Sequence, residues 1–140
     1  MAKFNSDWIE QNTVYRNTSV PGQVIPSYRR EDRRVIVCLC GSTRFRDAYE
    51  QAARIETLDG KIILSVGMFG HQEGLDMTGQ VKARLDELHM DKIDLADEVL
   101  VLNVGGYVGE STRREVLHAA RRAKTIRWLE PDAIPSDLAK

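Results

Sequence analysis

Two hydrophobic periodicities alternate along the chain from residue 35 onward. Short apolar runs that are typical of buried strands occupy residues 35–40, 61–64, 98–102 and 125–129, and segments with helical spacing fill about 44–58, 78–96 and 112–123. Strands separated by helices imply right-handed crossovers and a parallel sheet covered on both faces. The pattern therefore predicts a single-domain, doubly wound α/β fold of the Rossmann or flavodoxin type, with a mainly parallel sheet of about four to five strands.

Each helical segment also predicts an inward face. Apolar side chains spaced by three and four residues line up on one side of a helix. The side chains expected to point inward are Phe45, Ala48, Ala52 and Ile55 in the first helix, Val81, Leu85, Leu88 and Leu95 in the second, and Val116, Ala119, Ala120 and Ala123 in the third.

The first 34 residues differ in composition from the rest. They are rich in polar and turn-forming residues, which favours an arm or lid over a separate core. Four large apolar side chains of this segment need burial against the main domain or against a neighbouring subunit: Trp8, Ile9, Val14 and Tyr15. We therefore divide the chain into an arm (1–34), an α/β domain (35–131) and a C-terminal tail (132–140).

Composition narrows the classes of partner. The 140-residue chain has a net charge of −1 and dispersed basic residues, so nothing points to polymeric nucleic acid or to a membrane surface. No signal peptide or transmembrane run is visible, and we expect a cytoplasmic protein. We expect Cys38 and Cys40 on opposite faces of the first strand, where they cannot easily pair or share a metal. We interpret both as small apolar core residues.

Three predicted loops follow strands, so they meet at the carboxyl edge of the sheet, where open α/β folds bind ligands. They span residues 41–44, 65–74 and 103–112. Gly41 permits a tight turn, Ser42 or Thr43 can cap the next helix, and the start of that helix can hold an anion. The substrate-binding residues predicted from these loops are Gly41, Ser42, Thr43, Arg44, His71, Gly109 and Ser111.

Several familiar chemistries lack their motifs. The sequence contains neither a Gly-Lys-Ser/Thr phosphate loop nor a Gly-x-Ser-x-Gly nucleophile elbow. The three loops carry no cysteine and no clustered histidines, so we do not expect zinc. The remaining chemistry is that of a carboxylate acting beside a bound, phosphorylated small molecule, with no metal or organic cofactor.

Glu115 is the leading candidate for that carboxylate. It lies near the start of the third helix, from where it can attack or stabilise an electrophilic carbon at the sheet edge. The alternative is structural, because Thr112-Arg-Arg-Glu115 matches a capping box in which Glu115 folds back onto the helix start. Glu110, in the preceding loop, is the reserve catalytic carboxylate.

Three motifs resemble the nucleoside 2-deoxyribosyltransferase superfamily, which includes the 2′-deoxynucleoside 5′-phosphate N-hydrolases. They are Cys40-Gly-Ser-Thr-Arg44, Met90-Asp-Lys-Ile-Asp-Leu-Ala-Asp97, and the segment 106–119, which reads Gly-Tyr-Val-Gly-Glu-Ser-Thr-Arg-Arg-Glu-Val-Leu-His-Ala. The resemblance covers about residues 35–130. It implies the α/β fold already predicted and a reaction at an N-glycosidic bond.

The resemblance also implies roles for individual residues. Glu115, followed four positions later by alanine, matches the nucleophile that attacks the anomeric carbon. Gly41 and Ser42 match the turn beside the sugar or phosphate, and Ser111 lies where phosphate-using members keep a hydroxyl. The family commonly places an aspartate eight residues before the Ala-Asp aspartate. Here that position is His89. Either Asp91 takes the role of the family's aspartate or that role is lost, and we interpret His89 as a plain residue of the helix surface.

We therefore expect an N-glycosidic-bond hydrolase or deoxyribosyltransferase that acts on a nucleoside or nucleoside 5′-monophosphate, with Glu115 and Asp91 as catalytic residues. The resembling family builds its sites at subunit interfaces, which implies a homodimer or higher homo-oligomer. Two alternatives remain open on the same fold: a non-catalytic nucleotide-binding or sensing module, and a purely structural or partner-binding domain.

Overall fold

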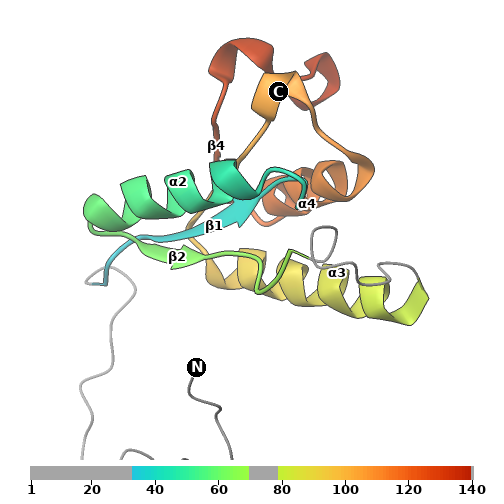
Figure 1. The fold of residues 1–140 in the computed structure, drawn as a ribbon, viewed down its shortest axis with the longest axis horizontal. Coiled ribbons are helices and arrows are strands. Elements are labelled where there is room, and N and C mark those ends of the chain that lie inside the picture. Colours follow the sequence, from blue (N-terminus) through green and yellow to red (C-terminus); the bar gives the residue numbers. More distant parts are fainter. Residues whose placement is uncertain (1–32, 70–78, 140) are drawn as a thin grey trace, which may run out of the picture. The chain divides into compact units, whose positions relative to one another are not determined.

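The computed structural model describes residues 33–69 and 79–139, and the fold within these ranges is a parallel sheet covered by helices (Figure 1). The strands are β1 (Ile36–Cys40), β2 (Ile62–Leu64), β3 (Glu98–Val101) and β4 (Thr125–Trp128). The helices are α2 (Arg46–Leu58), α3 (Gly79–Leu95) and α4 (Glu110–Arg121), with short 3-10 turns at η2 (Val104–Gly106), η3 (Pro131–Ala133) and η4 (Ser136–Leu138). The predicted alternation of strands and helices is confirmed.

The sheet has the strand order β2-β1-β3-β4 in the described part of the chain, and every pair is parallel. The chain first moves outward from β1 to β2 and then crosses back over β1 to β3. This reversal places the carboxyl ends of β1 and β3 beside each other at the centre, where doubly wound folds bind ligands. The α/β fold class predicted from the sequence is therefore confirmed.

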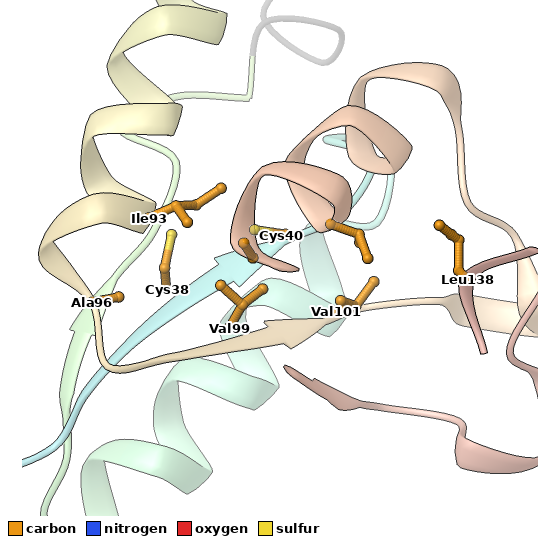
Figure 2. Close-up of a cluster of buried hydrophobic side chains, with 9 residues drawn as sticks. Cys38, Cys40, Ile93, Ala96, Val99, Val101 and Leu138 are labelled. Atoms are coloured by element: carbon orange, nitrogen blue, oxygen red, sulfur yellow. The ribbon is translucent and has the colours of Figure 1, made fainter. Parts of the chain in front are cut away.

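Side chains of β1 alternate between two buried layers. Val37 and Leu39 pack with Tyr49 and Ala52 of α2 on one face of the sheet. Cys38 and Cys40 both lie in the layer on the other face, beneath α3 and α4, together with Ile93 (Figure 2). The expectation that the two cysteines lie on opposite faces was wrong, because residues two apart in a strand point to the same side.

The inward faces of α2 and α3 differ from those that hydrophobic spacing predicts. In α2 the buried residues are Tyr49, Ala52 and Glu56, while Ile55 is 57% exposed. Glu56 is tolerated inside because Arg127 contacts its carboxylate at 2.6 Å and Lys61 at 3.1 Å. Glu56, a buried charged residue with ionic partners, thus lies at a core position that the spacing of apolar residues does not predict.

In α3 the helix buries only His89 and Ile93, and leaves Val81, Leu88 and Leu95 at least half exposed. The spacing of apolar residues predicted the wrong face of this helix. The residue of α3 that packs against the two thiols of β1 is a histidine. The expected inward face of α3 was therefore wrong.

The third helix follows its prediction more closely. Val116 and Ala119 of α4 are buried as expected, whereas Ala120 and Ala123 are exposed. Beyond α4 the chain packs back onto the core, because Leu138 of η4 joins the same layer as the two cysteines. Residues 132–139 are thus part of the folded unit. Among the described helices, none is long and apolar enough to cross a bilayer.

Candidate active site

A cleft of about 560 Å³ opens at the carboxyl edge of the sheet. Three segments that are distant in sequence form its walls: the turn after β1, one face of α3, and the start of α4. Val66, Gly67 and Met68, which follow β2, complete the rim. The strand order accounts for this meeting point, because the chain reverses direction across the sheet between β1 and β3.

Most of the residues predicted from the sequence line this cleft. The structure brings together Gly41, Ser42, Thr43, Arg44, Gly109, Ser111 and Glu115. Asp91 does not join them, since it is exposed on α3 and is not among the residues that line the cleft. His71 lies outside the described residues, as do the N-terminal apolar residues expected to need burial.

The turn after β1 leaves little room for a side chain at its first position. A Cβ on Gly41 would lie 3.0 Å from the Cβ of Leu102 and 3.2 Å from its carbonyl oxygen. The Tyr49 hydroxyl donates to the Gly41 carbonyl at 2.6 Å and fixes the turn from below. Glycine therefore lets the turn pack closely against Leu102, the residue that follows β3.

The hydroxyls of this turn do not cap α2. The N-cap is Phe45, and no side chain bonds to the helix start. The expectation that Ser42 or Thr43 caps the helix was wrong, because the turn is longer than predicted: the Phe45 amide donates to the Ser42 carbonyl. The Ser42 hydroxyl instead accepts from the Arg44 side chain at 3.1 Å, and the Arg44 guanidinium lies over the Tyr107 ring.

The start of α4 carries a hydroxyl held between two cations. Ser111 Oγ accepts from Lys82 Nζ at 2.9 Å and from Arg114 at 3.3 Å. Gly109 is the N-cap, so free amides of the first turn of α4 open onto the cleft beside these groups. Amides, a hydroxyl and two cations at a helix start form an anion-binding arrangement.

Glu115 lies deeper in the cleft and is 9% exposed. Because α4 begins at Glu110 and its N-cap has no side-chain bond, Glu115 is on the second turn and cannot close a capping box. Its Oε2 atom is buried, has no hydrogen-bond partner among the described residues, and lies 3.8 Å from Nε2 of His89. The capping alternative is therefore wrong. The reserve carboxylate, Glu110, is exposed at the rim and contacts Arg114.

Burial changes the acidity of this carboxyl. Desolvation raises the pKa of Glu115 from its usual 4.5 to about 7, and the charge of His89 offsets only part of that effect. Burial also lowers the pKa of His89, but its hydrogen bond with Cys38 and the charge of Glu115 outweigh burial and raise that pKa above 6.5. The carboxyl of Glu115 and the imidazole of His89 thus both keep their protons to a higher pH than usual.

His89 is not a surface residue, contrary to the interpretation offered for it. It is 6% exposed, and its Nε2 lies 3.3 Å from Cys40 Sγ and 3.7 Å from Cys38 Sγ. The hydrogen bond to Cys40, and then that to His89, lower the pKa of Cys38 to about 6 despite burial. Burial, followed by the bond to Cys38, raises the pKa of Cys40. The floor of the cleft is thus a connected polar cluster.

Sequence reasoning missed the contribution of α3 to the cleft. Lys82, Asp86, His89 and Lys92 all line it. They are spaced by three or four residues, so a polar stripe at helical period was visible in the sequence. Asp86 receives a bond from Lys82 at 2.8 Å, and Lys92 donates to the Ser65 carbonyl at 2.6 Å.

No protein-family model matches the chain, and no curated protein matches it. The residues that line the cleft and three short sequence motifs are therefore what bears on function.

Proposed function

We propose that the protein cleaves the N-glycosidic bond of a nucleoside 5′-monophosphate, with Glu115 as the nucleophile and water or a second base as the acceptor. The observation that supports this most is the buried, unpartnered Oε2 of Glu115 in a cleft whose rim offers anion-binding groups. A carboxylate oxygen that accepts no hydrogen bond is free to attack carbon. The resemblance to nucleoside 2-deoxyribosyltransferases points to the same residue.

The proposed reaction has two steps. Glu115 Oε2 forms a bond to the anomeric carbon, and the carbon–nitrogen bond breaks with its electron pair leaving on the base, which then takes a proton. Water or a second base next attacks the same carbon, loses a proton, and returns the carboxylate of Glu115. Asp86 faces the cleft and Asp91 does not, so we assign proton transfer or sugar orientation to Asp86.

A non-catalytic nucleotide-binding module is the second candidate. A specific observation favours it: with a pKa of about 7, a large fraction of Glu115 is protonated at neutral pH, and a protonated carboxyl is a poor nucleophile. Incubation with a panel of nucleosides and nucleotides separates the two. Release of free base supports the enzyme, and binding without release supports the module.

We expect 5′-monophosphates to bind more tightly than nucleosides, because the hydroxyl of Ser111 lies between Lys82 and Arg114 at the start of α4. Ser111→Ala should erase most of this preference, since one bond to a charged group contributes about 1.5–3 kcal/mol, roughly 10–100-fold in affinity. Titration calorimetry with matched nucleoside and nucleotide pairs measures it. Ser136→Ala, in the exposed η4 turn, is the control. Equal affinity for both ligand classes in the unaltered protein would contradict the phosphate assignment.

We also expect a homodimer or larger closed oligomer. Val81, Leu88 and Leu95 are spaced by seven residues on α3 and are 50%, 50% and 65% exposed. Such a stripe is typical of a helix that packs against a partner, and Leu88 also lines the cleft. Light scattering after size exclusion should give a multiple of the chain mass.

The stripe can be tested with a matched pair of variants. Leu95→Glu should shift the protein toward monomer, because it places a charge within the proposed contact. Leu58→Glu alters a residue that is 78% exposed on α2 and should leave the mass unchanged. A monomeric mass for the unaltered protein at micromolar concentration, with full activity, would reject this assembly.

A further inference from the structure

The polar cluster beneath the cleft has the composition of a metal site. Sγ of Cys38, Sγ of Cys40 and Nε2 of His89 all lie within 4.8 Å of one another, and all three residues are buried. The fourth side of the cluster is Oε2 of Glu115, 3.8 Å from His89 Nε2 and without a hydrogen-bond partner among the described residues. The chain contains no other cysteines.

The three separations that involve Nε2 of His89 are close to those of tetrahedral coordination. With zinc–sulfur bonds of ~2.3 Å and zinc–nitrogen or zinc–oxygen bonds of ~2.0–2.2 Å, neighbouring donor atoms lie ~3.3–3.8 Å apart. The two sulfur–nitrogen separations here are 3.3 and 3.7 Å, and the nitrogen–oxygen separation is 3.8 Å. Small movements of side chains would therefore bring all four donors onto one ion.

The surroundings fit a doubly charged cation and give it a route of entry. Two thiolates and one carboxylate carry more negative charge than one divalent ion neutralises. The ammonium group of Lys92 adds positive charge beside the cluster, where its charge acts on Cys38 and His89. The thiols are fully buried, but His89 and Glu115 line the cleft. An ion can thus enter from the cleft and reach the sulfur atoms between these two side chains.

We propose that Cys38, Cys40 and His89 bind a soft divalent cation of the zinc class, with Glu115 as the fourth ligand. Two thiol protons pass to solvent when the ion binds. Binding itself does not depend on the proposed enzymatic function. One consequence does: a bound ion holds the carboxylate of Glu115, so the metal-loaded protein is inactive in glycosidic cleavage.

Cobalt(II) is the direct probe, because tetrahedral cobalt has intense visible bands and thiolate ligands add a near-ultraviolet charge-transfer band. The full chain, freed of any tag, is stripped with a chelator, kept reduced and titrated with cobalt. We expect both features at one cobalt per chain and their loss when zinc is added. Absence of the charge-transfer band in the unaltered protein would overturn the proposal.

Variants assign the ligands. Cys38→Ser, Cys40→Ser and His89→Gln should each weaken cobalt binding by more than about 100-fold, since loss of even an outer-sphere partner costs about 10–100-fold. His118→Gln is the matched control, because His118 of α4 pairs with Asp94 at 2.8 Å near the C-terminal end of α3 and neither residue lines the cleft. Full binding by the folded cysteine variants would also overturn the site. These spectra need no substrate, so their outcome is independent of any assay of base release.

Discussion

Replacing Glu115 with glutamine should reduce turnover by several orders of magnitude while the nucleotide still binds. Glutamine keeps the size of the side chain but cannot form the bond to the anomeric carbon or carry charge beside it. Glu50→Gln, in which the altered carboxylate lies exposed on α2 and pairs with Arg46, should leave turnover unchanged. Base release measures turnover, and titration calorimetry measures binding.

The stability of the same variant carries a second expectation. Replacement of a capping residue would lower the free energy of unfolding by about 0.5–2 kcal/mol. Glu115 is instead a buried carboxyl whose Oε2 lacks a hydrogen-bond partner among the described residues, so Glu115→Gln should not lower the thermal midpoint at pH 8. A folded Glu115→Gln protein that retains turnover would remove Glu115 from the mechanism.

The second large effect concerns pH. Only the ionised form of Glu115 can attack, and its pKa of about 7 lies far above the usual 4.5. Activity should therefore rise with pH through about 7, and at pH 5 it should be ~1% of its plateau, because each pH unit below the pKa removes tenfold of the ionised form. The profile of kcat/KM against pH measures this limb. A limb near 4.5 would contradict the buried environment assigned to the carboxyl.

Stability should respond in the opposite sense. The pKa of Glu115 is higher in the folded state than in the unfolded state, so protonation of Glu115 stabilises the fold. This contribution to the free energy of unfolding is complete below about pH 4.5, is lost as the pH rises to about 7, and is absent above pH 7. The shift corresponds to on the order of 3 kcal/mol, since each pKa unit is worth about 1.4 kcal/mol. Unfolding of the unaltered protein and of Glu115→Gln at several pH values should show this difference. A difference in the free energy of unfolding between the two proteins that stays constant from pH 4.5 to 7 would argue against the raised pKa.

The alternation of the chain was enough to predict the fold. Short apolar runs such as 98–102, separated by helical segments, predicted each described strand and helix to within about two residues. The position of the cleft followed as well, because loops after parallel strands share one edge of the sheet. Local pattern and topology are properties that a sequence carries directly.

The chemistry at the base of the cleft was not predictable in the same way. The face of α3 that meets the sheet carries His89, which contacts the thiols of β1, and a count of apolar residues favours a neighbouring face of the helix. The shared face of Cys38 and Cys40 was available from strand geometry and was misjudged. The raised pKa of Glu115 depends on burial, which arises only when α3 and α4 close over β1.

Base release from nucleotides tests the central claim most directly. The metal-free protein and its Glu115→Gln variant are incubated with the four deoxyribonucleoside and four ribonucleoside 5′-monophosphates at pH 8, and free base is separated by chromatography. We predict release of base from at least one nucleotide by the unaltered protein and none above background by the variant. Nucleotide binding without release of base from any member of the panel would contradict the proposed enzyme and leave the binding module in its place.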